Sequence, residues 1–283
     1  MTPWMKINVP EEDLPFLDRL GLEYVPLETD LKQIAELNQS NWIVVPIKEN
    51  GKFQPDSRAF VHSQERVPYN EAVKKIEKEL GFNIKISRDS LDREFSGNID
   101  WFEAGMLNQA LGVKTPYAKQ EVDYLHLLYL GSQGKIKVFE NLGKQIKKDL
   151  CKKLFEDKVK EQSPWRASWL DNDFKTNGKN LNVNYNHIFD REKNILYSKS
   201  EVLDGNTLRQ RKQIDVLDYI TANHTTQGLI HKNVKSGNFY SFPPRSDDNS
   251  SAGFGVNSDR ASLDCFGDPS DRGGDLGVES VAD

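Results

Sequence analysis

Residues 239–283 constrain the fold more than any other part of the chain, because their apolar residues recur with a period of two in a polar background. More than half of these residues are Gly, Ser, Asn or Asp, which is typical of loops and disordered tails. The apolar residues nevertheless alternate in three groups: Phe254 and Val256, then Ala261, Leu263 and Cys265, then Leu276 and Val278. Such alternation is the period of a strand with one buried face. The stretch therefore predicts short strands joined by turns, with a disordered tail as the alternative.

The same stretch uses a restricted set of amino acids. It contains no Lys, Gln, Trp, Met, His, Ile or Thr, and its only Glu is Glu279, although the rest of the chain is rich in Lys and Glu. Three Arg stand against nine acidic residues there, which predicts an acidic surface. The amino-acid composition of this region must therefore be set by a constraint that does not act on the rest of the chain.

These residues resemble the variable region of proteins diversified by retroelements, in which a reverse transcriptase rewrites adenine-rich codons. In that family, Asn codons ending in a pyrimidine can become Asp, Ser, Gly, Phe or Tyr but not Lys, Gln, Trp, Met or Glu, which fits the missing residue types. The resemblance is good over residues 237–278, weaker over residues 165–236, and does not extend to the first 160 residues. The matching framework positions are Pro243-Pro244-Arg245-Ser246-Asp247, Asn249-Ser250, Phe254, Ser258-Asp259-Arg260-Ala261, Leu263, Cys265, Pro269-Ser270, Arg272 and Leu276-Gly277-Val278. The family usually has Arg after Leu-Gly-Val, where this chain has Glu279. This departure implies that the final strand packs differently from that of the family.

The resemblance implies a C-type lectin fold, similar to that of the formylglycine-generating enzyme, for the C-terminal part of the chain. We therefore expect an α+β protein in three parts. They are an α/β module over residues 1–90, a mostly helical region over 91–163, and a C-type lectin-like ligand-binding domain over 164–283. The variable region would cover about residues 239–278.

The resemblance also implies a binding protein that presents a diversified surface to a variable protein or another macromolecular ligand. Five alternating apolar residues would form the core: Phe254, Leu263, Cys265, Leu276 and Val278. The alternative is that Val256 and Phe266 belong to the core as well. By alignment to the family pattern, the variable, ligand-facing positions are Tyr240, Phe242, Gly253, Gly255, Val256, Asp264, Phe266, Gly267, Asp268, Gly273, Gly274 and Asp275.

Periodicity and turn signals predict the elements that precede this region. The strands and turns are a strand over 42–47 that pairs with 58–62 across a turn at 49–52, strands over 82–86 and 135–139, and a hairpin at Asn177-Gly178. A first helix is expected to open at 10–14. Further helices are expected over 68–80, ended by Gly81, over 100–111, and from the cap Thr115 and Pro116 to Gly131. A basic helix over 144–159 and a short helix over 215–220 complete the set.

Composition excludes several classes of protein. A net charge of −5 argues against a general nucleic-acid binder. No apolar run approaches the roughly 20 residues that span a membrane, and the N-terminus lacks the pattern of a secretory signal. Cytoplasmic, virion-associated and non-classical surface locations all remain open, as does the oligomeric state. Cys151 and Cys265 are predicted to be buried free thiols rather than a disulfide.

Candidate chemistry is sparse. His187 and His224, with Asp190 and Asp215 nearby, match no metal motif, and His126 lies on an apolar helix face. The acidic groups at 247–249 and 268–275 offer oxygen ligands for calcium without the alternation of an EF-hand. Cys265 lacks the second cysteine that formylglycine chemistry requires. We expect no catalytic residue, no metal and no cofactor.

Two alternatives remain open for the function. One is an enzyme with an active site within the first 160 residues and a C-terminal recognition module. The other is a phage or cell-surface structural protein with a fixed ligand.

Overall fold

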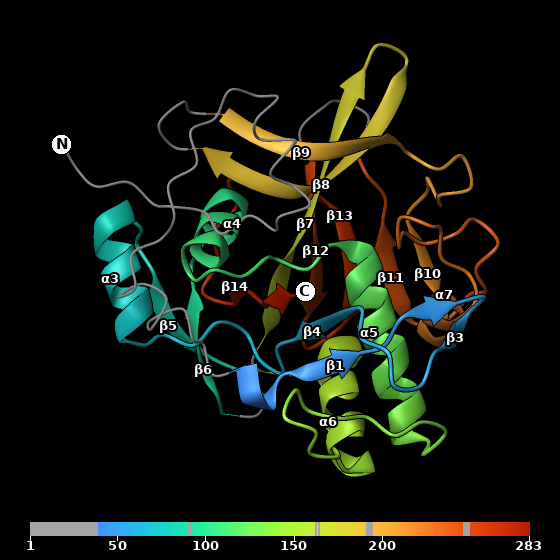
Figure 1. Ribbon diagram of the computed structural model, residues 1–283. Helices are drawn as coiled ribbons and strands as arrows, with labels where there is room; N and C mark the ends of the chain where they lie inside the picture. Colours follow the sequence, from blue (N-terminus) through green and yellow to red (C-terminus); the bar gives the residue numbers. More distant parts are fainter. Residues whose placement is uncertain (1–38, 90–91, 162, 164, 191–194, 246–249) are drawn as a thin grey trace.

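One large sheet organises the protein. The computed structural model describes residues 39–89, 92–161, 163, 165–190, 195–245 and 250–283 (Figure 1). The helix expected at 10–14 and the acidic group at 247–249 lie outside these residues. Within them the fold is of the α+β class, as expected.

The main sheet has the strand order β10-β11-β13-β12-β7-β8-β9, and β14 also pairs with β7. Strands β11 and β13 run parallel, as do β14 and β7, and the other pairs are antiparallel. The predicted hairpin joins β7 to β8, with Gly178 at a φ of 63° that suits glycine. The strands are β7 (Arg166–Asn177), β8 (Asn180–Asp190), β9 (Ile195–Val202), β10 (Lys212–Ile214), β11 (Phe239–Phe242), β12 (Ser250–Val256), β13 (Ala261–Gly267) and β14 (Leu276–Val278).

A smaller sheet joins the two ends of the described chain. Strand β4 (Phe60–His62) lies between β1 (Ile43–Val45) and β15 (Val281–Ala282), and both pairings are antiparallel. The pairing of β1 with β4 confirms the expected hairpin, and the turn at 49–52 joins β2 (Lys48–Glu49) to β3 (Lys52–Phe53). A further hairpin consists of β5 (Lys85–Arg88) and β6 (Glu94–Gly97).

The helices are α3 (Glu71–Leu80), α4 (Trp101–Ala110), α5 (Ala118–Ser132), α6 (Lys148–Val159) and α7 (Val216–Thr221), after a 3-10 turn η2 (Gln39–Asn41). Caps explain several of their ends. The Asn70 side chain accepts a hydrogen bond from the first turn of α3, and Gly81 ends that helix with a φ of 73°. Asp100 and Glu103 form a capping box at the start of α4, and Asp215 caps α7.

Helices cover both faces of the main sheet. Figure 1 shows α5 and α6 in front of β12, β13 and β11, and Leu125, Leu128, Leu154 and Phe155 of these helices share a core with Phe254 and Leu263. Helix α4 packs on the opposite face at β7, where the Trp169 indole donates to the carbonyl of Ile99 (3.0 Å) and the Trp101 indole to that of Leu170 (2.8 Å). The three expected parts of the chain therefore share their cores.

Several expected boundaries were wrong. Residues 135–139 form no strand, because Phe139 and Glu140 make isolated bridges to Gln145 and Ile43 rather than a ladder. Helix α5 begins at Ala118 after the cap residue Tyr117, not at Thr115, and α6 begins at Lys148 rather than 144. The strand expected at 82–86 begins three residues later, at Lys85, as β5.

Candidate functional site

Alternation in β12 and β13 divides their side chains between two faces of the main sheet. On the face toward α5 and α6, Phe254 is 4% exposed, Leu263 1% and Cys265 3%. Val278 is buried in a separate cluster with Trp101 and Leu107 of α4, and Leu276 packs against this cluster as a partly buried residue. These positions agree with the core expected from the sequence, and both cysteines are buried free thiols as predicted.

The other face of β11, β13 and β12 carries six of the expected ligand-facing positions. We call this surface the open face; it consists of Tyr240, Phe242, Gly253, Gly255, Asp264 and Phe266. In one row Phe242 stands opposite Asp264, which stands opposite Gly253. In the next row Tyr240 and Gly255 flank Ser262. Cross-strand partners point to the same face of a sheet, so these residues form one continuous surface.

Val256 does not belong to the open face, which corrects its expected ligand-facing position. It lies two residues from Phe254, on the same side of β12, and is 3% exposed. It pairs with Ala261 on β13 and Arg166 on β7. Val256 is therefore a core residue, as the alternative interpretation of the sequence expected. For Phe266 the core alternative is wrong, because this ring is 54% exposed.

The remaining expected positions lie at the end of β13 and in the segment that follows it. A side chain at Gly267 would meet the Trp169 ring at 3.2 Å, and Asp268 is exposed in a turn where it accepts from the amide of Ser270 (2.9 Å). Gly273 and Gly274 lie against the β5–β6 hairpin: the amide of Asn98 donates to the Gly273 carbonyl (2.9 Å) and the Ser87 hydroxyl to that of Gly274.

An open hollow accompanies this second group of positions. It measures about 370 Å³ and is lined by Ser87, Arg88, Trp165, Gly274 and Asp275. The expected site thus falls into two groups, the open face and the segment 267–275. Register joins the members of the first group, and loop contacts hold the second.

Three arginines surround the rings of the open face. The Arg211 guanidinium lies 4.7 Å from the centre of the Phe242 ring and 5.9 Å from that of Tyr240. Arg260 lies 5.8 Å from the Phe242 ring, and Arg245 lies 5.2 Å from that of Phe266. Sequence reasoning used Arg245 and Arg260 only as framework matches and missed Arg211, which reaches the rings because β10 pairs with β11.

Asp264 is the carboxylate of the open face. Burial raises its pKa above the usual range, while the Phe266 amide, which donates to Oδ1 at 2.7 Å, and the nearby Arg260 oppose the shift. Counting residues in the sequence predicted an acidic surface. Around the rings themselves, the geometry gathers three guanidinium groups and one aspartate.

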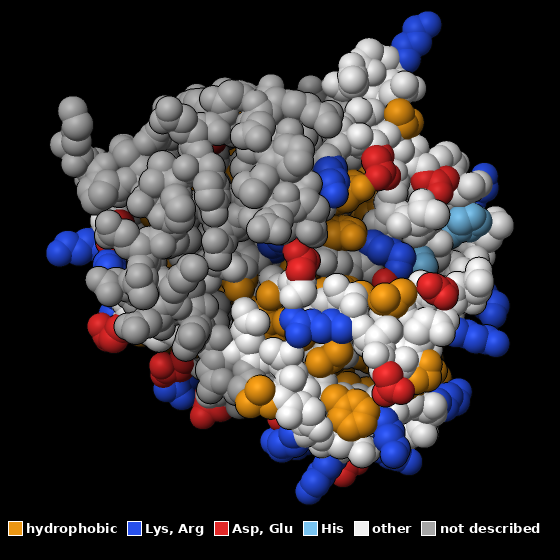
Figure 2. Space-filling model, viewed as in Figure 1, with side chains coloured by type: hydrophobic (Ala, Val, Ile, Leu, Met, Phe, Trp, Pro, Cys, Tyr) orange, Lys and Arg blue, Asp and Glu red, His pale blue; other side chains and the backbone are white. Residues whose placement is uncertain are grey.

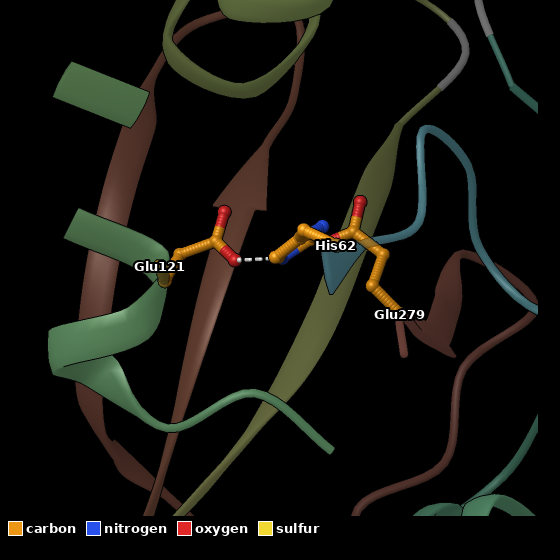
Figure 3. Close-up of side chains that lie close together, drawn as sticks. All are labelled: His62, Glu121 and Glu279. Atoms are coloured by element: carbon orange, nitrogen blue, oxygen red, sulfur yellow. Dashed lines mark hydrogen bonds and ion pairs between the residues drawn. The ribbon is translucent and has the colours of Figure 1, made fainter. Parts of the chain in front are cut away.

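A second candidate is a cluster of buried charges between α5, α6 and the smaller sheet. We call it the ionic cluster; it consists of His62, Glu121, Lys158, Arg166 and Glu279. The Lys158 ammonium bonds both Glu121 and Glu279, and Arg166 donates to Glu279 at 2.7 Å. His62 Nε2 lies 3.1 Å from Glu121 Oε2 (Figure 3). All five side chains are at most 5% exposed.

Opposite charges compensate one another in the ionic cluster. Burial alone would raise the pKa of Glu121, but Lys158 and His62 outweigh it and hold that pKa at about 2. Lys158 and Arg166 likewise hold the pKa of Glu279 below its usual range against the effect of burial. His62 Nδ1 faces the Ser63 carbonyl at 2.7 Å and can only donate to it. The His62 ring stacks on the Tyr124 ring, with centres 3.9 Å apart and planes at 3°.

Glu279, the departure from the family pattern, is thus an anchor of the final strand. Within the described ranges, His62, Glu121 and Glu279 are also the one group of three potential metal ligands close enough to share an ion. Lys158 already supplies the cation between the two glutamates. The space between Lys158, Arg166, Ser168, Phe254 and Val256 has no volume open to water. This arrangement supports a structural role for the cluster.

Of the histidines considered from the sequence, His187 and His224 have different hydrogen-bond partners. His187 Nδ1 pairs with Asp171 on β7, and Nε2 lies 3.3 Å from Oδ1 of Asp173. His224 Nδ1 faces the Thr225 carbonyl at 3.0 Å. Burial, with Lys48 nearby, lowers the pKa of His126 to about 4, so this ring is neutral at pH 7. Sequence reasoning missed the partners of His187, which lie 14 and 16 residues away along a neighbouring strand.

Comparison of the chain with protein-family models, with curated proteins and with solved structures gave no match. None of the helices in the described part of the chain has both the length and the apolar character that a membrane crossing requires. Lys, Arg, Asp and Glu side chains are intermixed on the face that Figure 2 shows.

Proposed function

We propose that the protein binds a macromolecular ligand through the open face, and that retroelement-directed mutagenesis diversifies this face. The observation that carries the proposal is the division of β12 and β13. Their core positions point toward α5 and α6, whereas Gly253, Gly255, Asp264 and Phe266 point away from them. Residues on one face of a strand can change without disturbing the packing of the other face.

The chemistry of the open face supports a role in binding. Tyr240, Phe242 and Phe266 offer contact area with few rotatable bonds, as aromatic residues do in antibody loops. Aromatic residues and arginine are also the types enriched at the energetic centres of protein interfaces. The strands are held by a sheet and two covering helices, so little conformational entropy is lost on association.

The wider proposal is that residues 164–283 form a C-type lectin-like domain, with residues 39–163 packed around it. The restricted residue set of 239–283 supports diversification, and the order of strands before a variable run supports the fold. Within this proposal the binding role needs no catalytic residue, metal or cofactor. The segment 267–275 and its hollow would form a second variable area beside the open face.

Sequencing the 3′ end of the gene across a population of the source tests the proposal. Diversification predicts substitutions confined to codons 240–275, concentrated at adenines of a template repeat, and absent from the codons of Phe254, Leu263 and Cys265. Substitutions spread evenly over core and open-face codons would contradict it. A uniform sequence would leave the alternative of a display protein with one fixed ligand.

A further inference from the structure

We propose that the open face recognises an acidic segment of a partner protein, with Arg211 and Arg260 pairing with carboxylates while Phe242 and Tyr240 pack against neighbouring apolar groups. This inference rests on the proposed binding function and names the chemistry of its ligand.

The arrangement of the two guanidinium groups around one ring is the first argument. Arg211 and Arg260 lie 4.7 Å and 5.8 Å from the centre of Phe242. The Tyr240 and Phe242 rings are near-parallel, with centres 6.2 Å apart and planes at 17°. A guanidinium group near a ring face is held by cation–π attraction, and its N–H edge remains able to donate hydrogen bonds. The site therefore offers two positioned, planar donors beside an apolar surface.

The second argument is that neither guanidinium group is held in an ion pair by a described carboxylate, although Asp264 lies near Arg260. Neither Arg211 nor Arg260 forms an ion pair with a carboxylate in the residues that the structure describes, whereas Arg88, Arg93, Arg166 and Arg272 all do. Asp264, on the same face, gives its Oδ1 to the Phe266 amide. A planar guanidinium group matches a carboxylate with two parallel hydrogen bonds, which are stronger than neutral ones.

Charge around the open face favours an acidic protein over a nucleic acid. The chain carries a net charge of −5, and Asp259, Asp268 and Asp271 are exposed on the turns next to these strands. A phosphate backbone places a charge at every nucleotide and needs an extended basic surface. Two guanidinium groups beside two rings suit a short segment with one or two carboxylates and an apolar side chain.

The test begins with a displayed library of random linear peptides, selected on the immobilised full chain. We expect enrichment of Asp or Glu next to an aromatic or aliphatic residue. Enrichment of basic or uncharged peptides, or no enrichment over bare support, would overturn the inference. A single-stranded DNA oligonucleotide that competes more strongly than the selected acidic peptide would assign the face to a different class of partner and overturn it as well.

Variants then locate the recognition. For a selected peptide measured by calorimetry, Arg211→Gln and Arg260→Gln should each weaken binding by about tenfold or more. Arg209→Gln removes the same charge two residues from Arg211, at an exposed position with no ring contact in the described structure, and should leave affinity unchanged. Equal losses in Arg209→Gln would show a general charge effect and contradict the proposal.

Tyr240→Ala and Phe242→Ala separate this inference from the function on which it rests. If both weaken binding while Arg211→Gln and Arg260→Gln do not, the open face binds its ligand but does not recognise carboxylate groups. If none of the four changes affinity and all four variants unfold like the parent chain, both proposals fail.

Discussion

At the scale of single residues, the main feature of the fold is how it handles buried charge. His187 lies between Asp171 and Asp173, and its ring packs edge-on against Trp101 at 4.8 Å. Burial lowers the pKa of His187, but the two aspartates outweigh it and raise the pKa to about 9. The protonated ring is therefore part of the folded state at neutral pH.

This raised pKa makes stability depend on pH in a defined window. The ring binds its proton more tightly in the folded chain than in the unfolded one, where the ordinary value is 6.5. The stabilisation is thus complete below pH 6.5 and is lost as pH rises through about 9. The free energy of unfolding should fall by on the order of 3 kcal/mol over this range. Urea unfolding between pH 6 and pH 9.5 should show this decline. His187→Gln should be less stable at pH 6 and lack the decline, and a parallel decline in that variant would contradict the assignment.

Glu279 gives a second prediction at this scale. It is 1% exposed and bonds Lys158 and Arg166. Glu279→Gln leaves two buried cations short of one counter-charge, which should lower the free energy of unfolding by about 3 to 5 kcal/mol. Glu71→Gln, which breaks the exposed pair with Lys74, should change it by less than about 0.5 kcal/mol. Similar effects of the two changes on urea unfolding would show that the cluster adds no stability.

At the scale of elements, local signals in the sequence correctly predicted those helices, turns and strands that depend on local interactions. The hairpin at Gly178, the end of α3 at Gly81 and the strands of 250–278 each follow from turn residues or alternation. Residues 135–139 alternate as well, yet they have no ladder partner, and alternation alone carries no information on pairing.

The composition of the sites was harder to predict than the elements. Alternation could place Phe266 and Asp264 on one face. Arg211, however, reaches the rings of Tyr240 and Phe242 through a pairing of β10 with β11 that no local signal reveals. The ionic cluster joins residues 62, 121, 158, 166 and 279, which only the tertiary structure brings together. Val256 was misassigned because alignment to a family pattern outweighed its own alternation with Phe254.

The two faces of the sheet can be tested with a matched pair of phenylalanines. Phe254→Ala should lower the free energy of unfolding by about 3 to 5 kcal/mol, because the ring lies in the core beside Phe239. Phe266→Ala should lower it by less than about 1 kcal/mol, since the ring is 54% exposed and contacts Arg245. Urea midpoints measure both. A large loss for Phe266→Ala would mean that the open face is part of the core.

At the scale of the whole molecule, segments distant in sequence complete one another. Strand β15 pairs with β4, and Arg272 bonds Asp100 and Glu103 at the start of α4. Helices α5 and α6 supply the apolar residues that cover β12 and β13. The strands of the C-terminal part of the chain therefore depend on earlier residues for their packing.

A fragment of residues 164–283 should consequently fail to fold by itself. Without Leu125, Leu128, Leu154 and Phe155, one face of its sheet would be exposed to water. We expect broad thermal unfolding by circular dichroism and poor dispersion of amide resonances. Adding residues 39–163 in trans, or restoring the full chain, should recover a cooperative transition. A sharp transition in the isolated fragment would instead establish an autonomous domain.

The position of Glu279 also affects the timing of folding in the cell. A ribosome synthesises Glu121, Lys158 and Arg166 long before it adds Glu279 and β15. Until then, Lys158 and Arg166 have only Glu121 and Asp157 as carboxylate partners, and β4 lacks its pairing with β15. Native closure therefore has to wait until β15 has been synthesised, and until then the growing chain must be kept from aggregating, a task that falls to chaperones. A message truncated even a few codons before that of Glu279 would yield a polypeptide that cellular proteases recognise and remove.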